Sequence, residues 1–324
     1  MSDLVPRLPE GYRSGAAVAP RLPDGYRSRA ATVADVPAIH GLVAAAEVAR
    51  HGRAETDADA VAADLARPGL DLGADTVLAY DEAGALAGRA WVNRRSEVDV
   101  HPAHRGRGLG AALLDWVDER ALRTGTVQVV QTVPDDDAAA VALVRSRGYA
   151  PMVTAWLLGI ALPDEPDVPE PPAGITVRHF RPGDERATHQ VTEDAFDAWQ
   201  QRRKSYDEWA MLTVGRETFA PELSPLAFAG DELVGAVLSL DVPDADEGYV
   251  ERVAVRPDHQ RRGVARLLLR HTFRDFHRRG RRGCTLWTHS DTGALALYER
   301  VGMTVRRSST VYRKRLETLA AQPN

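Results

Sequence analysis

The sequence is poor in cysteine, with Cys284 alone among 324 residues. One thiol excludes an intrachain disulfide framework and a cysteine-rich metal site, and we predict no metal centre. An excess of basic charge is also lacking, because 41 lysines and arginines stand against 46 aspartates and glutamates, giving a net charge of −5. Nothing global therefore attracts the chain to nucleic acid or to an anionic membrane.

Long apolar segments are absent as well. The N-terminus has no apolar core typical of a signal peptide, and no uninterrupted apolar run is long enough to span a bilayer. At 324 residues the chain is long enough for two domains of ordinary size. We therefore expect a cytoplasmic enzyme or binding protein with no nucleic-acid or membrane partner, and the composition leaves the oligomeric state open.

Two breaks in composition divide the chain. The segment Pro6–Ser14 recurs as Pro20–Ser28; we expect the first copy to be a poorly packed arm and Tyr26–Thr32 to become the first strand. The stretch Leu162–Gly174 is proline-rich, acidic and without apolar period, which is typical of a semi-rigid linker. The expected parts are an arm (1–25), a domain (26–161), a linker (162–173), a second domain (174–316) and a tail (317–324).

The two halves repeat one another. Each runs through a strand and helices, a hairpin, a strand ending in proline, a glycine-rich turn, an amphipathic helix, a strand, a short helix and a last strand that closes the domain. The same spacing, to within one residue, separates Gly263 from Gly108 and Gly302 from Gly148. We predict an α/β fold with an α+β mixed sheet, present as two tandem copies.

The glycine-rich turn carries the clearest chemistry. Small residues let the backbone approach a ligand closely, and the N–H groups and positive dipole end of the following helix favour a di-anionic phosphate. We predict that a pyrophosphate is held by Arg105, Gly106, Arg107, Gly108, Leu109 and Gly110 in the first half and by Gln260, Arg261, Arg262, Gly263, Val264 and Ala265 in the second.

Three nucleotide-binding interpretations compete for this turn. A P-loop needs Gly-Lys-Ser/Thr, which neither half has. A dinucleotide fingerprint fits Gly106, Gly108 and Ala111 only by force, because the second half has no matching first glycine and the turn comes late in the domain. The third pattern, Gln/Arg-x-x-Gly-x-Gly/Ala for acyl-CoA, is satisfied by both halves after a strand ending in proline.

On these residues each half resembles the GNAT family of N-acetyltransferases, most specifically over Val98–Leu114 and Val253–Leu269. The resemblance implies a mixed sheet splayed at the strand before the loop, with acetyl-CoA in the gap as acyl donor. Two such domains with a proline-rich linker are similar to tandem members of the family from actinobacteria. The resemblance also implies that pantetheine pairs with the strand backbone at Val100, Val253, Ala254 and Val255.

The two halves differ in the sequence of the late helix. Attack of a neutral amine on a thioester needs an acid for the leaving thiolate, a base for the ammonium proton and a donor for the oxyanion. In the family the acid is often a tyrosine in the sequence Leu-Tyr-Glu, which matches Leu297–Glu299, whereas Val144 in the first half cannot donate a proton. The resemblance therefore assigns the acid to Tyr298; the alternative is an aromatic that fills the helix–sheet interface.

The base is expected on the strand before the loop. Strand alternation predicts that Tyr249, Glu251, Val253 and Val255 share one face, which would place the Glu251 carboxylate upstream of the thioester. Pairing of Glu251 with a nearby arginine is an equal alternative. The remaining candidates are Glu247 and Asp246 as bases and the backbone N–H of Val253 as oxyanion donor, with Ser96 and Glu97 at the corresponding places of the first half.

The sequence says less about the acceptor. The acidic stretch Asp241–Glu247 would suit a cationic amine, although a solvated loop explains it as well. The aromatics Trp199, Tyr206 and Trp209 lie where the family forms a wall of the acceptor site, or belong to the core. We expect an acetyl-CoA-dependent N-acetyltransferase acting on a small primary amine through its C-terminal half. A non-catalytic acyl-CoA-binding module is the alternative.

Overall fold

The computed structural model describes residues 17–54, 56, 58–67, 69–93, 95–197, 202–242 and 245–316. These residues form two compact units, one of Val153–Ser309 and one of residues 2–152 with residues 310–324. The first copy of the arm repeat, the residue Trp199 and the tail 317–324 lie outside the described residues.

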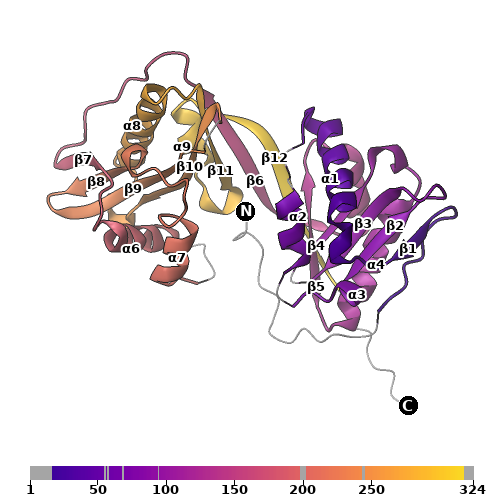
Figure 1. Cartoon of the computed structure of the whole chain (residues 1–324). Helices are drawn as coiled ribbons and strands as arrows, with labels where there is room; N and C mark the ends of the chain where they lie inside the picture. Colours follow the sequence, from indigo (N-terminus) through magenta and orange to yellow (C-terminus); the bar gives the residue numbers. More distant parts are fainter. Residues whose placement is uncertain are drawn as a thin grey trace. The chain divides into compact units, whose positions relative to one another are not determined.

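The first half contains the predicted series of elements in the predicted order (Figure 1). The expected first strand is present as a short strand, and the helix that follows it begins with a proline in its first turn. The elements are β1 (Arg27–Arg29), α1 (Val36–His51), α2 (Ala58–Leu65), α3 (Leu72–Asp75), β2 (Thr76–Tyr80), β3 (Leu86–Val92), β4 (Ser96–Val100), α4 (Leu109–Arg123), β5 (Gln128–Pro134), α5 (Ala138–Ser146) and β6 (Ala150–Ala161).

The second half repeats this series, which confirms the duplicated mixed α/β fold. Its elements are β7 (Ile175–His179), α6 (Glu185–Phe196), α7 (Tyr206–Leu212), β8 (Pro225–Ala229), β9 (Glu232–Leu240), β10 (Glu247–Val255), α8 (Val264–Arg278), β11 (Gly283–His289), α9 (Leu295–Arg300) and β12 (Thr304–Arg315). Helices α4 and α8 are both 15 residues long and each follows a left-handed glycine.

The closing strands differ from the sequence expectation. From Val153 on, β6 belongs to the unit of the second half, where it pairs antiparallel with β11 from Gly283↔Ala161 to His289↔Ala155. The end of β12 belongs to the other unit, where Leu316 N–H donates to the Val127 carbonyl at 2.9 Å. Each half therefore supplies the strand that completes the other unit, whereas the sequence predicted that it closes its own. The expected boundaries at 161 and 174 stay a prediction.

In the unit of Val153–Ser309 the sheet lies between two apolar layers. Helix α8 packs on one face through Leu267, Leu268 and Phe276, and α6 and α7 cover the other face through Val191 and Trp209 (Figure 1). The strand order runs β6-β11-β10-β9-β8-β7. The amphipathic pattern of each helix thus fixes which side of the helix packs on the sheet.

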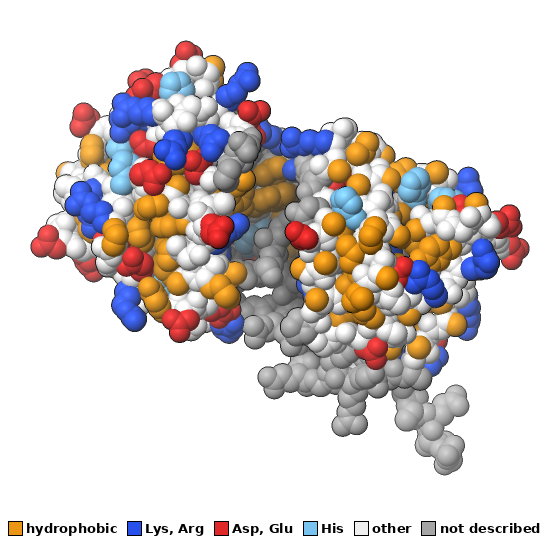
Figure 2. Space-filling view, viewed as in Figure 1, with side chains coloured by type: hydrophobic (Ala, Val, Ile, Leu, Met, Phe, Trp, Pro, Cys, Tyr) orange, Lys and Arg blue, Asp and Glu red, His pale blue; other side chains and the backbone are white. Residues whose placement is uncertain are grey.

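Charges of both signs share the surface. On the face shown in Figure 2, basic and acidic side chains are interspersed. The ion pairs agree with this picture, since Arg203 pairs with both Asp194 and Asp197, and Arg278 pairs with Glu165. Within the described residues, every helix is too short or too polar to cross a membrane.

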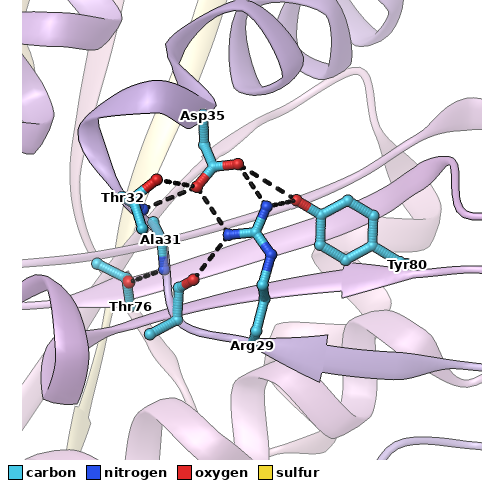
Figure 3. Close-up of polar contacts among 7 residues, drawn as sticks. Arg29, Ala31, Thr32, Asp35, Thr76 and Tyr80 are labelled. Carbon is cyan, nitrogen blue, oxygen red and sulfur yellow. Dashed lines mark hydrogen bonds and ion pairs between the residues drawn. The ribbon is translucent and has the colours of Figure 1, made fainter.

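A polar cluster fixes the first turn of each half. In the first half Arg29 donates to Asp35 at 2.7 and 2.5 Å, the Thr32 N–H donates to the same carboxylate, and the guanidinium lies 5.0 Å from the ring centroid of Tyr80 (Figure 3). The chain between Arg29 and Asp35 is thereby closed into a turn that aims α1 back across the sheet.

The second half contains the same cluster. Arg178 donates to Asp184 at 2.7 and 2.8 Å, the Arg181 N–H donates to that carboxylate at 2.8 Å, and the guanidinium lies 4.3 Å from the ring centroid of Phe228. The duplication therefore extends to individual hydrogen bonds.

We predict that replacing either carboxylate with alanine lowers the free energy of unfolding by a similar amount. The loss should be about 1–2 kcal/mol, because each carboxylate accepts a backbone N–H and a guanidinium. The guanidinium of Arg29 holds the pKa of Asp35 well below its usual range, and Arg178 lowers that of Asp184. A carboxylate whose pKa is lower in the folded protein than in the unfolded chain stabilises the fold at a pH above the unfolded pKa of about 3.9. This stabilisation is lost as the pH falls from that value toward the folded pKa.

Urea unfolding of Asp35→Ala and Asp184→Ala at pH 7 and pH 3 measures this effect. The deficit of each variant should shrink at the lower pH, and Asp167→Ala in the exposed linker is the control that should change nothing. Loss of stability in only one of the two variants would contradict the equivalence of the two turns.

Candidate active site

Strands β10 and β11 run together for only part of their length. They pair in parallel from Glu247↔Gly283 to Val250↔Leu286. Beyond Val250, β10 stays paired with β9 and β11 stays paired with β6, but the described residues of β10 and β11 no longer pair with each other. The two facing edges leave backbone N–H and C=O groups without a sheet partner, and such groups need another partner when they are not solvated.

A β-bulge lies where the two strands part. In the pairing of β10 with β9, Val250 faces Ser239 and Arg252 faces Leu238, so that Glu251 is the extra residue. A bulge inserts one residue, bends the strand and reverses the side-chain alternation beyond it. The prediction that Tyr249 shares a face with Val253 and Val255 is therefore wrong.

The core contacts show which residues share a face. Val250, Val253 and Val255 pack with the α8 side of the sheet, whereas Ala254 packs with the α6 and α7 side. Tyr249 pairs with Leu240 and Ala254 pairs with Ala236, two residues on the same face of β9. Tyr249 therefore points to the same face as Ala254 and away from Val253.

The glycine-rich loop follows β10 directly. After a short 3-10 helix at Pro257–His259, Arg261 has a φ of 61° and Gly263 has a φ of 87°, and α8 begins at Val264. In the first half Gly106 and Gly108 take the same conformation, with φ values of 74° and 80°. Arg261 is the one non-glycine residue with positive φ in the described part of the chain. The missing first glycine of the second loop is thus replaced by a strained arginine.

A glycine in the neighbouring strand lets this helix approach the sheet. A Cβ atom at Gly235 would lie 3.0 Å from Val264 Cγ1, and one at Gly88 would lie 3.1 Å from Leu109 Cδ2. The first turn of α8 therefore packs directly on β9, which holds the loop at the end of β10. Sequence reasoning missed Gly235, although a glycine stands at the matching place in both halves.

A pocket of about 580 Å³ opens between the parted strands and the loop. It brings together Glu251 from the bulge, Tyr298 from α9 and the loop glycine Gly263. Of the predicted residues in the second half, Glu251, Val253, Val255, Gln260, Arg261, Gly263, Val264, Ala265 and Tyr298 line it. Ala254 and Arg262 are outside the lining; Ala254 is buried in the α6 and α7 core. Lining residues that the sequence analysis missed include Phe196, Arg252, Arg266, Trp287, His289 and Arg300.

Tyr298 lies at the centre of α9 and is 7% exposed. Its hydroxyl makes no hydrogen bond to any residue that the structure describes. Burial raises the pKa of Tyr298, so the hydroxyl stays protonated at neutral pH. In the first half Val144 takes its place, because Tyr149 N–H donates to the Val144 carbonyl as Met303 N–H donates to the Tyr298 carbonyl, each at 3.1 Å.

Glu251 has two arginine neighbours at long distance. Arg216 Nη1 lies 3.5 Å from one carboxylate oxygen and Arg252 Nη2 lies 3.9 Å from the other. Burial and the charge of Glu251 raise the pKa of Tyr249 to about 12. Glu251 therefore pairs with Arg216, as the alternative predicted, while it also lines the pocket; its role as the base stays a prediction.

The two second-choice bases, Glu247 and Asp246, lie outside the described pocket lining. Glu247 accepts from Arg306 Nη1 at 2.6 Å. Helix α8 ends at Arg278 within the charged run His277–Arg282, where cations suit the helix dipole, and the left-handed Gly280 follows. Trp209 is 1% exposed and belongs to the core. Cys284 is also buried, and its burial raises the pKa of the thiol.

The first half presents the loop without the acid. Arg105, Gly106, Arg107 and Gly108 form the turn after Val100, and Arg105 Nη2 lies 3.8 Å from Asp137. Strand β4 is held to β5 by the Ser96 hydroxyl, which donates to the Val130 carbonyl at 2.7 Å, and Glu97 accepts from Trp91 Nε1 at 2.9 Å. Leu109 and Gly110 begin α4, and CoA binding to this loop stays a prediction.

Comparisons with known proteins agree with this architecture. Residues 186–303 match the acetyltransferase (GNAT) family, and residues 73–151 match an acetyltransferase (GNAT) domain. The chain is 31% identical to the mycothiol acetyltransferase of Catenulispora acidiphila, over 67% of this chain and 71% of that protein. It is also 31% identical to that of Saccharopolyspora erythraea, over 71% of this chain and 82% of that protein.

Solved structures show the same tandem layout. A GCN5-related N-acetyltransferase from Sphaerobacter thermophilus has 34% identity and a TM-score of 0.73, over 91% of this chain and 97% of that chain. A tandem GNAT protein of the clavulanic acid biosynthesis pathway shares the fold at 19% identity and a TM-score of 0.65, over 90% of this chain and 99% of that chain. The chain therefore belongs to the GNAT family of acetyl-CoA-dependent N-acetyltransferases.

Proposed function

We propose that the C-terminal half transfers the acetyl group of acetyl-CoA to the primary amine of a small molecule by direct attack. One observation carries the proposal: the same pocket is lined by the glycine loop, the open strand edge, Glu251 and Tyr298. A donor held by the loop and the strand would present its thioester between the carboxylate and the hydroxyl.

The donor is assigned to backbone groups. The N–H groups of Gln260–Ala265 and the N-terminus of α8 suit the pyrophosphate, because the helix dipole and unpaired N–H groups favour an anion. The open edge of β10 at Val253 and Val255 suits the amides of pantetheine, whereas the predicted Ala254 lies outside the described pocket lining. The Val253 N–H is the proposed oxyanion donor.

The two side chains divide the proton transfers. The neutral amine nitrogen attacks the thioester carbon, forming a C–N bond, and collapse of the tetrahedral intermediate breaks the C–S bond. Glu251 takes the ammonium proton directly or through water, and Tyr298 donates its proton to the leaving thiolate. The hydroxyl regains a proton from solvent before the next turnover.

The first half has a structural or cofactor-holding role in this proposal. Its loop keeps the conformation of the second, with Gly106 and Gly108 in place, but Val144 stands where an acid is needed. The alternative of a non-catalytic acyl-CoA-binding module therefore applies to the first half alone.

The acceptor is proposed by class. The relatives are named mycothiol acetyltransferases, so an amine precursor of mycothiol is the first acceptor to test. Amino sugars, aminoglycosides and polyamines complete the panel. A cytoplasmic location fits the proposal, because acetyl-CoA is made and used inside the cell.

We predict that Tyr298→Phe lowers kcat by about 10²–10⁴-fold while acetyl-CoA still binds, because only the proton donor is lost. Thiol release with the amine panel measures turnover, and calorimetry measures binding. Tyr312→Phe, which removes a buried hydroxyl outside the described pocket lining, is the matched control. An unchanged rate in Tyr298→Phe would remove Tyr298 from the mechanism.

We predict that Gly263→Glu abolishes acetyl-CoA binding to the C-terminal half, because a carboxylate would face the pyrophosphate and repel it. Gly263→Ala, which carries the same left-handed backbone strain without the charge, should bind more weakly by about tenfold at most. Gly108→Glu is the matched change in the first loop and should leave turnover intact. Tight binding by Gly263→Glu at the C-terminal loop would disprove the loop assignment.

A further inference from the structure

The described lining of the pocket has a charge opposite to that of the chain. One carboxylate, Glu251, stands with four guanidiniums, those of Arg252, Arg261, Arg266 and Arg300. The chain as a whole has a net charge of −5. Local fields of this kind select ligands by charge, since low-dielectric walls focus the potential inside a cleft.

Two carboxylates of the acidic stretch Asp241–Glu247 are already held by other arginines. Asp241 accepts from Arg281 Nε at 2.7 Å and from Arg279 Nε at 3.2 Å, and Glu247 accepts from Arg306. Of the described carboxylates in the acidic stretch, Asp241 and Glu247 are therefore paired with arginines of their own unit, and Asp246 is not among the residues that line the pocket.

The amine end of the pocket is itself flanked by cations. Arg216 and Arg252 approach the two oxygens of Glu251, and Arg252 also lies 5.9 Å from the ring centroid of Phe196, a lining residue. A bound donor carries phosphates that balance the arginines near the loop, Arg261 and Arg266, but it brings no charge to Arg216 and Arg252. An amine that reaches Glu251 therefore meets one negative and two positive groups.

We infer that the acceptor has a single cationic centre, its reacting amine, on a neutral or anionic body, and that polycations are poor acceptors. This inference rests on the proposed function. A second ammonium about 8 Å from either guanidinium would lower kcat/KM by about thirtyfold at an effective dielectric constant of about 20. An anionic group at the same place would have the opposite effect.

Three acceptors of equal length test the inference: 6-aminohexanoate, hexylamine and 1,6-diaminohexane. Each is measured at saturating acetyl-CoA as a substrate, or as a competitive inhibitor of the acetylation of whichever panel amine is turned over. We expect kcat/KM to be highest for 6-aminohexanoate, lower for hexylamine and lowest for 1,6-diaminohexane. The differences in kcat/KM should narrow as the salt concentration rises from about 0.05 to 0.5 M, because screening weakens the charge interactions.

Reversing the charge of Arg216 distinguishes an electrostatic effect on acceptor choice from a general loss of activity. Arg216 is 44% exposed and lies outside the described pocket lining, and its guanidinium is 3.5 Å from the Glu251 carboxylate. Arg216→Glu should raise the diamine-to-hexylamine ratio of kcat/KM by about tenfold or more. Arg278→Glu, the same change at an exposed residue that pairs with Glu165, is the control and should leave the ratio unchanged.

The outcomes separate the inference from the proposed function. Equal use of the diamine and hexylamine by the native protein, or no change of the ratio in Arg216→Glu, would overturn the inference while acetyl transfer stands. Failure to acetylate any amine, with acetyl-CoA still bound, would overturn the proposed function and the inference with it.

Discussion

The separation of β10 from β11 is the constraint on which the site depends. Four residue pairs hold the parallel strands together, up to Val250↔Leu286, and each strand then keeps only its outer neighbour. The sheet can open at this place because neither strand loses all its hydrogen bonds. The loop continues from β10, and the helix that bears Tyr298 continues from β11. One local loss of pairing thus sets both walls of the pocket.

The sequence predicted the features that depend on residues close together along the chain. Glycine spacing and the proline before it identified both loops, and the Leu-Tyr-Glu segment identified Tyr298, because each signal lies within a few residues. The bulge at Glu251 has no such signal, so regular alternation gave the wrong face for Tyr249. The exchange of β6 and β12 was also missed, because both strands have the same pattern and only long-range pairing decides which sheet edge each one joins.

The duplicated skeleton and the divergent site follow different rules. The Arg29–Asp35 and Arg178–Asp184 turns, the close-packed Gly88 and Gly235 and the left-handed loop residues are kept in both halves, since each fixes the path of the backbone. Tyr298 has Val144 in its place, and Glu251 is the extra residue of a bulge that the pairing of β3 with β4 lacks. Backbone geometry is therefore shared where the fold requires it, and side chains differ where the pocket lies.

The same pair of strands is used differently in the two halves. In the first, Arg89 lies opposite Asp99, donates to it at 2.7 Å and is only 4% exposed. A slip in register would leave this buried guanidinium without its carboxylate, so the pair fixes the alignment of β3 with β4. In the second half Ala236 lies opposite Ala254, and small apolar residues impose no such penalty. The strand there accommodates the bulge that brings Glu251 to the pocket. A charged pair in place of these alanines would resist the change of register that the site needs.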